Sequence, residues 1–157
     1  LASLAPGRDA IGYLALPDLE SATLVELARS AATGEKTASA VERHFRNLGK
    51  HVEWVGDAPG LILGRIVSQL VNEAAFTLER GIGSAEDIDT AMRLGFNYPR
   101  GPLEWGEEIG LDRVLAILDA LRGELGEERY RAAPLLRRMV AEGRLGSSTG
   151  AGFFSYS

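Results

Sequence analysis

Apolar and polar positions alternate in the first third of the chain, a pattern typical of short strands. Residues 11–16 and residues 23–28 form two such apolar runs. Between residues 36 and 48 the apolar positions recur at helical spacing instead, and residues 51–55 alternate again. The order of strand, helix and strand predicts a βαβ unit, with a small parallel or mixed sheet.

The rest of the chain has helical periodicity. A wide apolar stripe predicts a long helix over residues 61–78, because apolar residues recur at positions 62/63, 66/67, 70/71, 74/75 and 78. We expect Leu70 to face the core in the middle of this helix. A second stripe, closed by Gly123 or Gly126, predicts a helix over residues 111–121.

Several residues are typical of helix ends and turns. Ser84 is expected to cap a helix that ends at Gly95 and buries Ile88, Ala91 and Met92. Residues 97–102 are expected to form a turn, because neither of their prolines can continue a helix. Pro134 suits the first position of a last helix that stops at Gly143. Three aromatic residues near the C-terminus suggest that the tail from residue 146 docks on the bundle.

The composition and charge of the chain exclude several classes of protein and of functional site. The chain has 157 residues, of which 45% are apolar and 25% charged, with a net charge of −5. These values are ordinary for a globular domain and exclude extended disorder. There is no cysteine, and the two histidines leave few choices for a metal site or a general base. No apolar run is long enough to cross a membrane, and the slight acidity argues against nucleic acid. We therefore expect a soluble, cytoplasmic domain without a metal.

The residues alone offer little chemistry. Glu26 interrupts an apolar strand, and it is either an outward-facing strand residue or a functional carboxylate. Asn72 lies in the most apolar helix, where it either holds a helix end or loop in place or contacts a ligand. His44 and His51 are more typical of structural histidines than of catalytic ones. The glycine-rich tail lacks the preceding strand, following helix and lysine of a phosphate-binding loop. The pattern thus indicates a helical domain with a small α/β appendage and no self-sufficient active site.

A series of motifs nevertheless resembles the C-terminal domain of the 3-hydroxyacyl-CoA dehydrogenases, which are NAD-dependent enzymes of fatty-acyl oxidation. The resemblance runs in order and with the right spacing over residues 57–156. The family motifs D-x-P-G-F-I-x-N-R, G-P-F-E and V-G-L-D correspond to D-A-P-G-L-I-L-G-R at 57–65, G-P-L-E at 101–104 and I-G-L-D at 109–112. The motifs N-E-A at 72–74 and E-D-I-D-x-A-M, within residues 85–92, are matched in full, and residues 146–156 follow the glycine-rich closing motif.

The resemblance implies a mainly α fold, namely a helical bundle like the C-terminal domain of 6-phosphogluconate dehydrogenase, preceded by a small α/β lobe. Residues 1–57 would be a reduced Rossmann-like lobe, and residues 58–157 the helical domain. In the first lobe, residues 24–26 resemble part of the family strand K-L-V-E-V, and residues 48–50 match its L-G-K motif.

The departures from the family pattern concern the catalytic residues. The family places its catalytic histidine in H-F-F-N-P, whereas residues 13–17 here read Y-L-A-L-P. The active-site asparagine of D-x-P-G-F-I-x-N-R corresponds to Gly64. Glu26 matches the carboxylate that orients the catalytic histidine, so it would be vestigial. The resemblance thus implies that no catalytic set is intact and that this chain binds no NAD.

One subgroup is especially similar over residues 91–106. These long bacterial enzymes of phenylacetate degradation act on 3-hydroxyadipyl- or 3-hydroxybutyryl-CoA and carry a second helical domain after a shortened Rossmann remnant. By that resemblance the full-length enzyme uses NAD, and this piece would form a homodimer, contact upstream catalytic domains and wall an acyl-CoA cleft. The cleft positions would be Gly64, Asn72, Asn97 and Tyr98. The alternative is a stand-alone, non-catalytic helical module for protein interaction.

Overall fold

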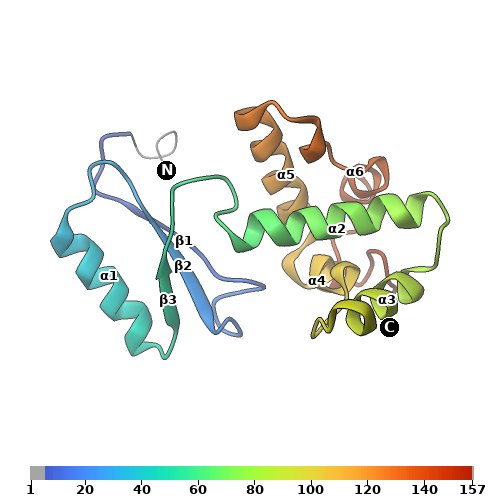
Figure 1. The fold of residues 1–157 in the computed structure, drawn as a ribbon, viewed down its shortest axis with the longest axis horizontal. Coiled ribbons are helices and arrows are strands. Elements are labelled where there is room, and N and C mark those ends of the chain that lie inside the picture. Colours follow the sequence, from blue (N-terminus) through green and yellow to red (C-terminus); the bar gives the residue numbers. More distant parts are fainter. Residues whose placement is uncertain (1–5, 157) are drawn as a thin grey trace. The chain divides into compact units, whose positions relative to one another are not determined.

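The computed structural model describes residues 6–156, and the chain divides into two compact units, Leu1–Gly64 and Arg65–Ser157 (Figure 1). The first unit contains a three-stranded sheet and one helix: β1 (Ile11–Leu14), β2 (Leu24–Arg29), α1 (Glu35–Asn47) and β3 (His51–Trp54). The strand order is β1-β2-β3, with β1 antiparallel and β3 parallel to β2. The βαβ unit in a mixed sheet is therefore confirmed.

The core of the first unit lies between the sheet and α1. Val25 and Leu27 alternate inward from β2, and they pack with Phe45 of α1 and Val52 of β3. This alternation follows from the two-residue period of a strand, which sends Glu26 to the opposite face of the sheet. The helix thus covers one face of β2, and the other face carries the candidate carboxylate.

The second unit is made of helices. It takes in most of α2, followed by α3, α4, α5 and α6, with two short 3₁₀ segments: α2 (Leu63–Glu79), α3 (Ala85–Phe96), α4 (Pro102–Ile109), α5 (Leu111–Leu125), Glu128–Tyr130, α6 (Pro134–Ala141) and Ser147–Thr149. The mainly α fold with a small α/β lobe is thereby confirmed. Assignment of residues 1–57 and 58–157 to two family domains stays a prediction, because by contacts the first unit extends to Gly64.

The predicted helix ends are largely confirmed. Ser84 accepts a hydrogen bond from the amide of Asp87, whose carboxylate accepts from the Ser84 amide in return, which completes a capping box. Gly126 ends α5, and Pro134 begins α6. The helix α3 continues one residue past the predicted Gly95, and Asn97 then adopts a left-handed conformation with φ of 55°.

The helix α4 was not predicted, because its first residue, Pro102, was assigned to the preceding turn. Its N-terminus is capped by a side chain from a neighbouring helix: the buried carboxylate of Asp89 accepts the amides of Leu103 and Glu104, each at 2.9 Å. A Cβ atom at Gly101 would lie 2.0 Å from the Asp89 carboxyl carbon, so only glycine allows this approach. Burial raises the pKa of Asp89.

The expectation that Leu70 faces the core is wrong. Val71 and Ala75 are fully buried in the middle of α2, whereas Leu70 is half-buried at the surface. Similarly, α3 buries Ile88 and Asp89, while Ala91 is exposed and Met92 half-buried. An apolar stripe wider than the buried face of a helix has two halves, and only packing decides which half faces the core.

The tail docks on the bundle, as predicted. Phe153 and Phe154 pack against a cluster formed by Ala74, Ala85, Ile88 and Leu103. Among residues 6–156 no helix is long and apolar enough to cross a membrane.

Candidate functional site

Glu26 is buried on the central strand, with only 2% of its surface exposed. Its carboxylate accepts the backbone amide of Ile62 at 3.2 Å, and both oxygens accept the amide of Leu63, at 3.1 and 3.2 Å. These amides lie at the start of α2, where unpaired N–H groups and the helix dipole favour a negative charge. The outward-facing interpretation of Glu26 is therefore wrong, because the carboxylate binds the end of a helix.

The neighbour of Glu26 across the sheet is not an imidazole. In the antiparallel register of β1 and β2, Leu14 lies directly opposite Glu26, and directly opposite residues share one face. Tyr13 lies on the other face, with its ring centroid 5.4 Å from that of Phe45. The position beside the carboxylate is thus aliphatic and can neither accept nor donate a proton.

The two histidines of the chain serve elsewhere. His44 is exposed on α1 and contacts the ring of Phe45 edge-on. The imidazole of His51 is exposed on β3 and lies 3.0 Å from the carboxylate of Glu53. Both arrangements match the structural interpretation of these residues, and neither places an imidazole against the Glu26 carboxylate.

A helix N-terminus can bind the phosphates of a dinucleotide when its amides are free, and α1, which begins after β2, is the only helix among the described residues that lies wholly in the first unit. Here the carboxylate of Asp9 already accepts the Gly34 amide at 3.3 Å and the Thr37 hydroxyl at 2.6 Å. Glu35 adds a second negative charge in the first turn. The residues at this helix end therefore do not fit a pyrophosphate. The described part of the chain contains no group of three or more His, Asp or Glu side chains that could hold a metal ion.

The four predicted cleft positions have different surroundings. Gly64 is buried in the first turn of α2, where it has no amide side chain to offer. Asn72 is buried, and its side chain donates to the carbonyl of Arg131 at 3.0 Å and accepts the amide of Ala133 at 2.8 Å. Asn97 is exposed at the end of α3, and Tyr98 is stacked between two aromatic rings. Asn72 therefore holds a loop in place, one of the two roles expected for it.

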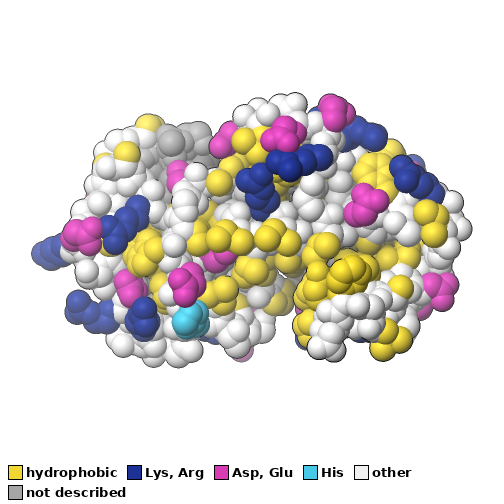
Figure 2. Space-filling view, viewed as in Figure 1, with side chains coloured by type: hydrophobic (Ala, Val, Ile, Leu, Met, Phe, Trp, Pro, Cys, Tyr) yellow, Lys and Arg dark blue, Asp and Glu magenta, His cyan; other side chains and the backbone are white. Residues whose placement is uncertain are grey.

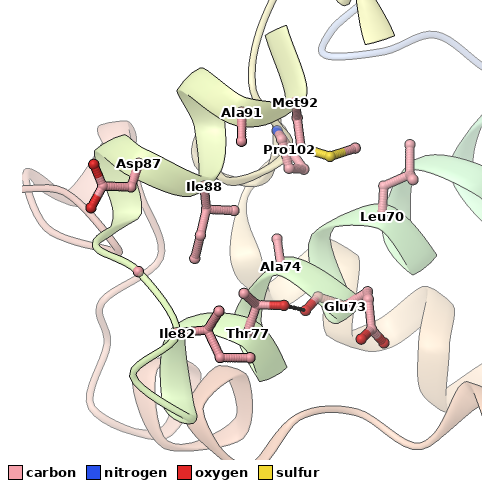
Figure 3. A pocket seen from close by; sticks show the side chains of 11 residues that line it. Leu70, Glu73, Ala74, Thr77, Ile82, Asp87, Ile88, Ala91, Met92 and Pro102 are labelled. Carbon is pink, nitrogen blue, oxygen red and sulfur yellow. Dashed lines mark hydrogen bonds between the residues drawn. The ribbon is translucent and has the colours of Figure 1, made fainter. Parts of the chain in front are cut away.

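A groove between α2 and α3 was missed by sequence reasoning. This α2–α3 groove has a volume of about 370 Å³ and is shown in Figure 3. Its lining consists of Leu70, Glu73, Ala74, Thr77, Ile82, Gly83, Asp87, Ile88, Ala91, Met92 and Pro102. Small residues on facing helices, Ala74 and Ala91, leave the hollow, and large apolar residues surround it. The sequence did contain a signal for it, because the apolar stripe of α2 is wider than the face that the helix buries.

The surface around the groove is also apolar. Ile82, which lines the groove, is 72% exposed, and elsewhere on the two helices that form it Ile66 and Leu94 are 55% and 83% exposed. Apolar side chains gather over α2 on the face shown in Figure 2. Contiguous exposed apolar surface of this kind marks an interaction site more often than scattered apolar residues do.

Comparison with known proteins agrees with the fold and with the motifs. The family model "3-hydroxyacyl-CoA dehydrogenase, C-terminal domain" matches residues 60–156. A probable 3-hydroxybutyryl-CoA dehydrogenase of Bacillus subtilis is 41% identical over 133 residues, which are 85% of this chain and 46% of that protein. The 3-hydroxyadipyl-CoA dehydrogenase of Escherichia coli is 40% identical over 121 residues, 77% of this chain and 26% of that protein.

Solved structures show the same relationship. The (S)-3-hydroxybutyryl-CoA dehydrogenase of Ralstonia eutropha superposes with a TM-score of 0.80 and 41% identity, covering 94% of this chain and 52% of that one. The chain thus spans about half the length of several of the relatives it matches. The family model covers more than half of the chain, so the chain belongs to the 3-hydroxyacyl-CoA dehydrogenase family and contains its C-terminal domain.

Proposed function

We propose that this chain serves pairing and formation of the acyl-CoA cleft in an NAD-dependent 3-hydroxyacyl-CoA dehydrogenase, without carrying out hydride transfer itself. The proposal rests on the contacts that the Glu26 carboxylate makes. Its carboxylate binds the backbone of α2 and faces Leu14, so no base is held for the substrate hydroxyl. A general base must lie within hydrogen-bond reach of the proton it takes, and here the required side chain is absent.

The reaction of the whole protein is part of the same proposal. The relatives are named as dehydrogenases of 3-hydroxybutyryl- and 3-hydroxyadipyl-CoA, and this chain spans only part of each. We place the oxidation of 3-hydroxyacyl-CoA to 3-ketoacyl-CoA, and NAD itself, in a nucleotide-binding domain upstream of this sequence. Residues 1–57 would then be the reduced Rossmann-like lobe before a second helical domain. The absence of a G-x-G-x-x-G loop from the sequence supports that assignment.

The α2–α3 groove is the proposed pairing surface. Most of its exposed lining is apolar, and Ile82, one of the lining residues, is 72% exposed. Leaving such a surface in water costs free energy that a second copy of the chain removes by covering it.

We expect light scattering at tens of micromolar (on the order of concentrations that populate even weak pairs) to give the mass of a dimer. Ile82→Glu should convert the dimer to a monomer, because it puts an unpaired charge into the covered surface. The side chain of Ile82 is 72% exposed, so the fold should survive. Leu48→Glu, the same chemical change at a half-exposed residue after α1, should leave the dimer intact.

Two results would contradict this pairing surface. One is a strictly monomeric mass for the unmodified chain at that concentration. The other is an equal response of the dimer to the changes at Ile82 and Leu48, which would place pairing elsewhere.

The cleft role is tested by hydrogen exchange on the full-length protein with an acyl-CoA. If Gly64, Asn72, Asn97 and Tyr98 lie near the substrate, residues 61–73 should become protected on binding. Since the Asn72 amide is committed to Arg131 and Ala133, we expect it to hold the wall of the cleft and not to contact the ligand.

The alternative is a stand-alone helical module for protein interaction, and the exposed groove favours it as much as it favours pairing. The same exchange experiment separates the two functions. An acyl-CoA that protects the upstream domains but leaves residues 61–73 unchanged would support the interaction module and contradict the cleft role.

A further inference from the structure

Glu107 is a buried carboxylate that neither the pairing surface nor the proposed cleft uses. It lies on α4 with 1% of its surface exposed, and no ion pair to it is found among residues 6–156. The C-terminal tail covers it. Its Oε1 accepts the amide of Phe153, whereas Oε2 is buried without a hydrogen-bond partner among the described residues. The amide of Phe154 and the hydroxyl of Tyr156 lie near the same group.

The tail is shaped to close over this side chain. A Cβ atom at Gly152 would lie 2.0 Å from a carboxylate oxygen of Glu107, and one at Gly146 would lie 2.4 Å from its carbonyl oxygen. Gly146 also has φ of 112°, a conformation that favours glycine. The hydroxyl of Ser147 donates to the carbonyl of Glu107 at 3.2 Å. Residues 146–156 therefore form a clasp around one carboxyl group.

Closure of the clasp also completes a small apolar core. Phe153 and Phe154 follow directly after Gly152, and they pack against the cluster of Ala74, Ala85, Ile88 and Leu103. If the clasp opens, this cluster loses its cover. The state of the Glu107 carboxyl group is thereby coupled to exposure of an apolar surface on the helical unit.

The groups that face Glu107 do not neutralise its charge fully. The guanidinium of Arg144, which donates to the carbonyl of Gly152, favours the ionised carboxylate. On the other side, Tyr156 is also close to the carboxylates of Glu104 and Asp89. Burial and the neighbouring Glu107 raise the pKa of Tyr156 to about 12, so its hydroxyl keeps its proton.

We propose that the clasp is a pH-dependent latch, in which the tail is held closed while Glu107 carries a proton and opens more readily once Glu107 is ionised. Burial raises the pKa of Glu107 in the closed state, and the donors from the tail and Arg144 offset this only in part. In the open state the carboxyl is solvated and returns towards its ordinary pKa of 4.5. The closed state therefore binds the proton more tightly, so closure is favoured at low pH and weakens as the pH rises through the raised pKa.

Hydrogen exchange of the whole chain, followed residue by residue by NMR between about pH 4 and 8 (the range that brackets a raised carboxyl pKa), tests the latch. After correction for the intrinsic exchange rate, the opening equilibrium at the Phe153 amide should increase with pH and then level off. The increase is about tenfold for each unit by which the pKa of Glu107 is raised. The Val71 amide in the core of α2 should not follow this curve, because it opens only with the whole unit.

Glu107→Gln keeps an acceptor for the Phe153 amide but cannot ionise, so its opening equilibrium should stay flat and low over the same range. The exposed Glu124→Gln is the matched control and should keep the full pH dependence. Should Glu107→Gln fail to fold, Tyr156→Phe provides a second measurement. It removes a donor that stabilises the ionised carboxylate, so the midpoint should move to higher pH.

Three results would overturn the proposal. The first is an opening equilibrium at Phe153 that does not change with pH. The second is a pH dependence that persists in Glu107→Gln, which would assign it to Asp89 or Glu104. The third is a parallel change at Val71, which would show that pH acts on the stability of the whole unit and not on the tail.

Discussion

Titration of NADH into this chain by calorimetry will give no saturable heat, and the chain will oxidise no 3-hydroxyacyl-CoA. The reason lies in two helix ends. The chain has no G-x-G-x-x-G loop, and the N-terminus of α1 is already occupied by the carboxylate of Asp9. The N-terminus of α2 is occupied by Glu26, whose neighbour Leu14 cannot take a proton. General-base catalysis alone contributes roughly 10² to 10⁴ in rate, and loss of the cofactor removes the reaction itself.

Restoring the catalytic residues should not restore activity. In the double variant Leu14→His and Gly64→Asn, an imidazole would stand opposite Glu26 and an amide at the start of α2. The variant should still be inactive, because the chain has no G-x-G-x-x-G loop to hold the cofactor. The Bacillus subtilis relative, measured in the same calorimeter, is the positive control. Saturable binding of NADH to the unmodified chain with micromolar affinity would mean that the first unit is a working nucleotide domain.

Glu26→Ala should destabilise the first unit by about 2–5 kcal/mol, because it removes the charged acceptor of the partly buried backbone amides of Ile62 and Leu63. A vestigial residue without a structural role would cost much less. The measurement is urea unfolding, followed through the fluorescence of Trp54, which packs against the core of this unit.

Two controls separate the lost acceptor from the lost charge. Glu26→Gln keeps an acceptor oxygen for the α2 amides, so it should recover part of the stability. Glu53→Ala changes the residue paired with Glu26 in the register of β3, but its side chain is exposed, so little change is expected. If Glu26→Ala unfolds at the same urea concentration as the unmodified chain, the carboxylate does not hold α2.

The elements with strong local signals could be predicted from the sequence. The βαβ unit follows from the alternation in residues 23–28 and 51–55, and the start of α3 from Ser84 and its capping partner Asp87. The short helix α4 could not be predicted in this way. Its cap, Asp89, comes from another helix. Its sequence also contains Gly106, which disfavours a helix but allows the close approach of Val71.

The contacts of the candidate site could not be predicted from the sequence. The lack of an imidazole near Glu26 can be read from residues 13–17, because the chemistry of a side chain does not depend on the fold. That Glu26 caps α2 could not be read, since its partners lie 36 and 37 residues further along the chain. Nothing in the local pattern links a strand carboxylate to amides at that distance in sequence.

The sequence by itself thus determined the family and the helical character, since these depend on residue identity and local spacing. Only the tertiary structure decided that Val71 and not Leu70 faces the core, and that the outer half of the same stripe lines a groove. It also decided that Glu26, Asp89 and Glu107 are buried and bound to distant backbone amides. The physical reason is the same in each case: burial and hydrogen bonding arise between segments far apart in the chain, and periodicity reports only on neighbours along it.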